Sequence, residues 1–275
     1  MAVEPLNGLS LRATSVADDL GFVALADLAR VLGADEELPY RVIGGQMMMV
    51  LAARWGLGAD LYRVTLDADL GTPPAVVHDH ALVERLIALG YQQVAGDRFA
   101  RAVDDIPAGV ETDTREAVID ILLPAYSSRP AQHRRAGDLV ASEALGLAAA
   151  LQRPPVVIDL KLLRLNGELL EIGLSFADEP SALVLKAFAT RARYTTTDHT
   201  DVWRCLEIAH AAGITLDKFR GINEMKDGAD VVRSLFSERH GPGMSALTED
   251  QRLSEMAADR RYTRIRALIN EVLGP

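Results

Sequence analysis

Apolar residues recur along this chain with two different periods, which predicts both helices and strands. In residues 15–33 they recur every three or four positions, so we expect a helix that Ser15 caps and Gly33 ends. In residues 62–70 apolar and polar side chains alternate, as they do on a strand with one buried face. Residues 117–123 are nearly all apolar, which predicts a more deeply buried strand.

Along the whole chain, these patterns predict an α/β (α+β) fold, with a small mixed sheet flanked by helices. Pro154-Pro155 marks a boundary, so we divide the chain into a core at residues 1–153 and a second region at residues 154–275. The second region should begin with a hairpin at Asn166-Gly167 and continue as helices. The other expected features are an extended or frayed stretch at 1–14, a strand at 40–43, helices at 45–55, 80–89, 180–193 and 201–212, a hairpin around 99–101, and a loop at 238–248.

Composition and charge narrow the function classes. No apolar run is as long as a membrane span, and the N-terminus lacks the pattern of a signal peptide, so we expect a cytoplasmic protein. The single cysteine, Cys205, lies in a helical pattern and is expected in the core. The net charge of −10 argues against broad, non-specific binding of nucleic acid, but it permits a local basic groove. Candidate residues for such a groove are Arg129, His133, Arg134, Arg135, Arg191 and Arg193.

Three aspartates suggest a metal site. Asp67 and Asp69 point to the same side of their strand because strand side chains alternate. Neighbouring carboxylates repel each other unless a cation lies between them. Asp120 lies within the buried strand at 117–123, where an ionised group needs a partner or a metal, so it is the natural third ligand. Carboxylates together with substrate phosphates commonly hold Mg²⁺. The alternative is a solvated strand face, because Asp-x-Asp also arises by chance.

Gly44-Gly45 precedes the expected helix at 45–55, and glycine allows a ligand to approach the backbone closely. Together with Arg63-x-Thr65-x-Asp67-x-Asp69 and the later Asp120, these glycines resemble the nucleotidyltransferases of the DNA polymerase β superfamily. More narrowly, the pattern is similar to the AbiEii/AbiGii toxin family, which includes the MenT-like toxins.

A later part of the chain carries the same resemblance. The family has a lysine on a helix, then an arginine, then a Lys-Asp-x-x-Asp element. The matching residues here are Lys186, Arg191, Asp198 and Asp201, and Thr197 stands where the family has its second lysine. The resemblance covers roughly residues 40–210, and it implies a polymerase β-type core followed by a helical C-terminal region.

The resemblance also implies a reaction, the transfer of a nucleoside monophosphate from a nucleoside triphosphate to an acceptor. Asp67, Asp69 and Asp120 would hold Mg²⁺, with Mn²⁺ as the alternative ion. The residues expected along the nucleotide are Gly44, Gly45, Gln46, Arg63, Thr65, Lys186 and Arg191, with Asp198 and Asp201 fixing Lys186 or contacting the nucleotide.

The acceptor that the resemblance favours is tRNA, in a toxin–antitoxin system with a cognate antitoxin as partner. Two alternatives stay open. One is a nucleotidyltransferase that acts on a cationic, aminoglycoside-like small molecule, which the acidic chain suits better than it suits RNA. The other is a non-catalytic binding module with the same fold.

Overall fold

The computed structural model describes residues 5–33, 38–58, 61–62, 65–79, 81–107, 115–192 and 195–275. Within these residues, nine strands form one mixed sheet, and the expected α/β class is confirmed. The order along the sheet is β1-β10-β11-β2-β3-β6-β5-β4, and β9 pairs with the end of β6. The strands are β1 (Gly8–Arg12), β2 (Arg41–Ile43), β3 (Asp67–Gly71), β4 (Gln92–Gln93), β5 (Arg98–Ala102), β6 (Glu116–Pro124), β9 (Glu143–Ala144), β10 (Val156–Leu163) and β11 (Leu169–Phe176); β7 (Arg134–Ala136) and β8 (Leu139–Ala141) form a separate hairpin.

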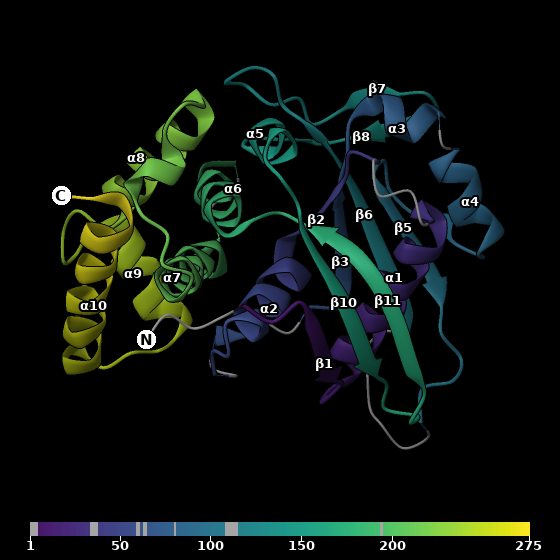
Figure 1. Cartoon of the computed structure of the whole chain (residues 1–275), viewed down its shortest axis with the longest axis horizontal. Helices are drawn as coiled ribbons and strands as arrows, with labels where there is room; N and C mark the ends of the chain where they lie inside the picture. Colours follow the sequence, from purple (N-terminus) through teal and green to yellow (C-terminus); the bar gives the residue numbers. More distant parts are fainter. Residues whose placement is uncertain are drawn as a thin grey trace.

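Of the α-helices that the structure describes, five precede the hairpin of β10 and β11 in the chain, and the five that follow it gather at one side of the sheet (Figure 1). The helices are α1 (Val16–Leu32), α2 (Gly44–Arg54), α3 (Pro74–Asp79), α4 (Leu82–Ala88), α5 (Leu147–Gln152), α6 (Glu179–Ala192), α7 (Thr196–Ala211), α8 (Asn223–Leu235), α9 (Pro242–Asp250) and α10 (Glu255–Leu273). Helix α2 contacts β2 and β3 as well as α6 and α7, so it links the sheet to the C-terminal helices.

Helix α1 forms as its sequence predicts and covers one face of the sheet. Ser15 accepts a hydrogen bond from the backbone of Asp18, whose carboxylate accepts in return from the backbone of Ser15, which is a complete capping box. Gly33 ends the helix with φ +72°. The helix packs against β3, β6 and β11, and its apolar side chains are buried among theirs.

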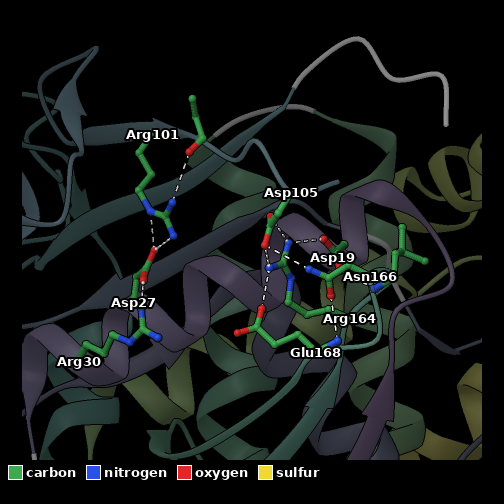
Figure 2. Close-up of polar contacts among 10 residues, drawn as sticks. Asp19, Asp27, Arg30, Arg101, Asp105, Arg164, Asn166 and Glu168 are labelled. Carbon is green, nitrogen blue, oxygen red and sulfur yellow. Dashed lines mark hydrogen bonds and ion pairs between the residues drawn. The ribbon is translucent and has the colours of Figure 1, made fainter. Parts of the chain in front are cut away.

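Two buried carboxylates of α1 tie this helix to neighbouring segments (Figure 2). Asp19 accepts a 2.9 Å hydrogen bond from Arg164, which lies at the end of β10 and also binds Asp105 and Glu168. Asp27 accepts a 2.7 Å hydrogen bond from Arg101 of β5. These two contacts fix α1 to β5 and to the segment that follows β10.

Several expected boundaries differ from those in the structure. Of the strand expected at 62–70, the structure describes a strand from Asp67 onward, and residues 63 and 64 lie outside the described residues. The loop expected at 238–248 is largely helix α9, because Pro242 occupies the first helical turn, where its missing N–H costs nothing. The helix expected at 201–212 begins at Thr196, because Thr195 caps it. Asp198 and Asp201 therefore both lie on α7.

Other expected elements are confirmed. The hairpin around Asn166-Gly167 joins β10 to β11 with all eight residues of each strand in register. This hairpin belongs to the same sheet as β2, β3 and β6, so the sheet crosses the boundary drawn at residue 153. The residues at 8–12 are extended and pair with β10 in parallel as β1.

Candidate metal centre

Three carboxylates meet on the face of the sheet opposite α1. Asp69 of β3 lies directly across from Asp120 of β6, and Asp67 precedes Asp69 on the same side of β3. One oxygen from each carboxylate lies within 4.8 Å of the others. The residues of β3 that alternate with the two aspartates, Ala68 and Leu70, are fully buried on the side that faces the core. Because the opposite face is packed, the carboxylates stand on rigid backbone.

The donor set fits a hard divalent cation. All three groups offer carboxylate oxygen, and each residue is partly exposed, so an ion can reach them. Without a cation, their negative charges repel one another, which makes some positive partner necessary. The arrangement can therefore hold a divalent metal ion, as the sequence suggests.

Gly44 brings the start of helix α2 against one of these carboxylates. Gly44 has φ +72°, and a Cβ built on it would overlap the Oδ2 atom of Asp69. Only glycine allows this close approach without strain. Helix α2 begins at Gly44, and the residue before it, Ile43, has no side chain able to cap the backbone N–H groups of the first turn. The positive end of the helix thus lies beside Asp69, where it favours negative charge.

Thr65 and Gln46 support the first carboxylate. The hydroxyl of Thr65 donates a hydrogen bond to Oδ1 of Asp67. The side-chain amide of Gln46, which is 1% exposed, donates a 2.9 Å hydrogen bond to the backbone carbonyl of Thr65. Gly45 lies against the Thr65 side chain. Gln46 therefore acts on the centre through Thr65, whereas the sequence led us to expect Gln46 beside the triphosphate.

Arg98 is the residue that the sequence reasoning missed. It begins β5, where the register places it directly across from Asp120. Its Nε and Nη2 atoms donate hydrogen bonds of 2.8 and 2.7 Å to the two oxygens of Asp120, and Nη2 also lies 3.5 Å from Oδ2 of Asp67. The hydrogen bonds to Asp120 raise the pKa of Arg98 above its ordinary value. The sequence predicts a hairpin around 99–101, but it does not predict which residue of the neighbouring strand lies opposite Arg98.

Lys186 and Asp201 form a second charged group between α6 and α7. The Nζ atom of Lys186 donates a 2.9 Å hydrogen bond to Oδ2 of Asp201, and Arg204 donates a 3.0 Å bond to Oδ1. The side chains of Lys186 and Asp201 are 6% and 0% exposed. Asp201 is thus in a position to fix Lys186, and the ammonium group lies within the protein at this point.

The other residues that were expected to contact the nucleotide lie at separate places in the structure. Asp198 is buried near the start of α7, and its carboxylate accepts a 2.6 Å hydrogen bond from the Thr195 hydroxyl. Thr197 donates to Asp250 of α9. Arg191 is exposed at the end of α6, where it lines a cavity of about 580 Å³. Arg63 and Arg193 lie outside the described residues.

Cys205 lies in the core, whereas the basic residues at 129–135 are exposed. Cys205 is buried, and burial raises the pKa of its thiol to about 12, so it stays protonated at neutral pH. Arg134 of β7 forms a 3.1 Å ion pair with Glu143. Arg129 and Arg135 are exposed.

Comparisons with known proteins add no relative. No protein family matches the chain, and no curated protein matches it. In the part of the chain that the structure describes, no helix has both the length and the apolar character that crossing a membrane requires.

Proposed function

We propose that this chain is a metal-dependent nucleotidyltransferase with a polymerase β-type core, similar to the AbiEii/AbiGii toxins. The observation that carries the proposal is the position of Gly44 against Asp69. It puts the uncapped first turn of α2, which suits phosphate, beside three carboxylates that suit a divalent cation. A phosphate site adjoining a metal site is the basic requirement for transfer from a nucleoside triphosphate.

Different residues would have different roles in such a reaction. Asp67, Asp69 and Asp120 would hold Mg²⁺ or Mn²⁺, which when bound would neutralise charge on the attacking and leaving oxygens. The backbone N–H groups at Gly44 and Gly45 would orient the triphosphate. Asp120, once released from Arg98, would accept the proton of the incoming hydroxyl.

Lys186 and the neighbouring arginines would contribute positive charge to triphosphate binding. In the described structure, Lys186 is held by Asp201. For Lys186 to meet the triphosphate, as the family resemblance implies, it must exchange this carboxylate for a phosphate. Arg191 is the exposed cation nearest to it in the sequence.

The acceptor that we propose is the 3′ end of tRNA, with an antitoxin as the regulatory partner. One observation favours a cationic small molecule as the second candidate. The cavity that Arg191 lines also presents Tyr126 and three carboxylates of α8, those of Glu224, Asp227 and Asp230. An aromatic ring among carboxylates suits an organic cation.

The test of the proposed function is transfer of label from each of the four α-labelled nucleoside triphosphates, in Mg²⁺, into total tRNA or into an aminoglycoside. Asp69→Asn should reduce transfer by at least about a hundredfold, because even residues that only support metal ligands cost ten- to a hundredfold when changed. Asp159→Asn is the matched control, since Asp159 is an exposed carboxylate on β10 of the same sheet.

The outcomes separate the candidates. Label in tRNA supports the toxin-like acceptor, and label in the aminoglycoside alone supports the second candidate. If wild type transfers label and Asp69→Asn transfers it equally well, the metal-centre assignment is wrong. Triphosphate binding without transfer to either acceptor would favour a binding module.

A further inference from the structure

Arg98 occupies the carboxylate cluster as a metal ion would. Its guanidinium engages both oxygens of Asp120 and lies near Asp67, so it touches two of the three groups in the candidate centre. Such bidentate pairs with a carboxylate are the stronger class of charge-assisted hydrogen bond. Any cation that takes oxygens from Asp120 must therefore compete with this arginine.

The placement of Arg98 follows from strand register. Asp69 pairs with Asp120 across β3 and β6, and Asp120 pairs with Arg98 across β6 and β5. The three side chains consequently form one row across the sheet, all on the face away from α1. Arg101, three residues further along β5, faces the opposite side and binds Asp27 of α1.

Charge and exposure indicate what Arg98 does there. The Arg98 guanidinium supplies positive charge directly to two of the three carboxylates, those of Asp120 and Asp67. The Arg98 side chain is 46% exposed, whereas those of Asp120 and Asp67 are 17% and 29% exposed. The arginine can thus leave toward solvent while the carboxylates stay on their strands.

We propose that Arg98 is a resident counter-ion, which holds the metal-free carboxylates together and competes with the divalent cation for Asp120 and Asp67. The inference rests on the proposed metal centre. Its consequence is weak retention of metal by the free protein. A triphosphate, which supplies further oxygen ligands, then helps to keep the ion in place.

The experiment titrates the full chain with Mn²⁺ alone and measures the dissociation constant by calorimetry. Arg98→Met should bind Mn²⁺ at least about tenfold more tightly than wild type, because the ion no longer has to break charge-assisted hydrogen bonds. The Mn²⁺ affinity of Arg98→Lys should lie between those of wild type and Arg98→Met, since an ammonium group is a point charge and cannot bind both carboxylate oxygens as the planar guanidinium does. Arg30→Met is the control, because Arg30 is exposed on α1 and carries the same charge.

A second measurement shows whether the variant is folded and whether Arg98 serves the metal-free state. Without metal, the melting temperature of Arg98→Met should fall below that of Arg30→Met, because Asp67 and Asp120 then lose the positive charge that Arg98 supplies. Mn²⁺ should raise the melting temperature of Arg98→Met by more than that of wild type. If Arg98 formed only a surface ion pair with no connection to metal, its replacement would not combine a lower melting temperature without metal with a larger rise in melting temperature on adding Mn²⁺.

The results that would overturn the inference differ from those that would overturn the proposed function. Equal Mn²⁺ affinity in wild type, Arg98→Met and Arg30→Met, or weaker affinity in Arg98→Met, rejects the counter-ion and leaves the metal centre intact. Absence of Mn²⁺ binding from all of these proteins rejects the metal centre, and the counter-ion with it. Binding that survives in Asp69→Asn places the ion elsewhere and also rejects both.

Discussion

At the scale of single residues, the centre depends on a glycine that no other residue type can replace. Gly44 has a positive φ and adjoins Asp69 so closely that a Cβ would overlap the carboxylate. A second set of contacts supports Asp67. The Thr65 hydroxyl donates a hydrogen bond to Asp67, and the Gln46 amide donates one to the backbone carbonyl of Thr65. Small changes at these positions should alter the centre without removing any metal ligand.

Gly44→Ala should therefore weaken Mn²⁺ binding by at least about tenfold, because misplacing even supporting groups of a metal site costs ten- to a hundredfold. Gly56→Ala is the matched control. Gly56 follows α2, has φ +64° and has open space where a Cβ would be, so it should lose only about 1–2 kcal/mol of stability from backbone strain. Calorimetric titration with Mn²⁺ and urea unfolding measure the two effects. Equal Mn²⁺ affinity in both variants would show that the close approach of Gly44 to Asp69 is unimportant.

At the scale of elements, α6 and α7 are joined through the buried carboxylate of Asp201. Lys186 and Arg204 both bind it, so its removal leaves two cations without their partner. Asp201→Ala should lower the free energy of unfolding by about 3–5 kcal/mol, the range for breaking a buried ion pair. Lys161→Ala should cost less than about 1 kcal/mol, because its pair with Glu171 is 60% exposed on both sides.

Urea unfolding of the two variants makes this comparison. If Asp201→Ala costs no more than Lys161→Ala, the pair is not a structural link between the helices. Titration with triphosphate then tests the second role of Lys186. If Lys186→Met folds and binds triphosphate as wild type does, Lys186 only links α6 to α7 and does not bind the triphosphate.

The hydrogen bond by which Glu224 of α8 contacts α5 depends on pH. Its carboxylate accepts a 3.0 Å hydrogen bond from the backbone N–H of Ala149, and burial raises its pKa. Between the unfolded pKa and the raised folded pKa of Glu224, the folded state binds more protons than the unfolded state. The contribution of Glu224 to stability therefore falls as pH rises through this range. The gain in stability of Glu224→Gln over wild type should accordingly increase from pH 4 to pH 7. Urea unfolding at both values measures it, and a constant difference would contradict the raised pKa.

At the scale of the whole molecule, the net charge of −10 limits how the chain can bind RNA. The proposed acceptor requires local basic side chains to bind phosphates despite the overall repulsion. Arg129 and Arg135 are exposed, whereas Arg134 is already paired with Glu143. The double change of Arg129 and Arg135 to Gln should weaken tRNA binding and flatten its salt dependence, by a slope of about 0.7–0.9 for each phosphate that the protein no longer neutralises.

Binding of labelled tRNA between low and moderate salt measures this slope. Arg30→Gln is the control, because it changes the charge on α1, across the sheet from the candidate centre. An unchanged slope in the double variant would place the RNA surface elsewhere or favour a small acceptor.

The sequence by itself determined the features that depend on neighbours along the chain. The cap at Ser15 and the stop at Gly33 define α1 because both act through backbone groups within one helical turn. The period of two puts Asp67 and Asp69 on one side of β3 whatever that strand pairs with. Where such local signals were ambiguous, as at Pro242, the expected element was wrong because proline suits a loop and a first helical turn equally well.

Only the tertiary structure decided which distant residues meet. Asp120 is far from Asp67 in the sequence and joins it because β3 and β6 pair in parallel in one particular register. Arg98 reaches Asp120 because β5 pairs with β6, and a shift of one residue would turn its side chain toward α1. Strand order and register depend on which whole faces pack together, as α1 does against β3, β6 and β11, and no short stretch of sequence contains that information. The carboxylates were therefore predictable as candidates, whereas their arginine partner was not.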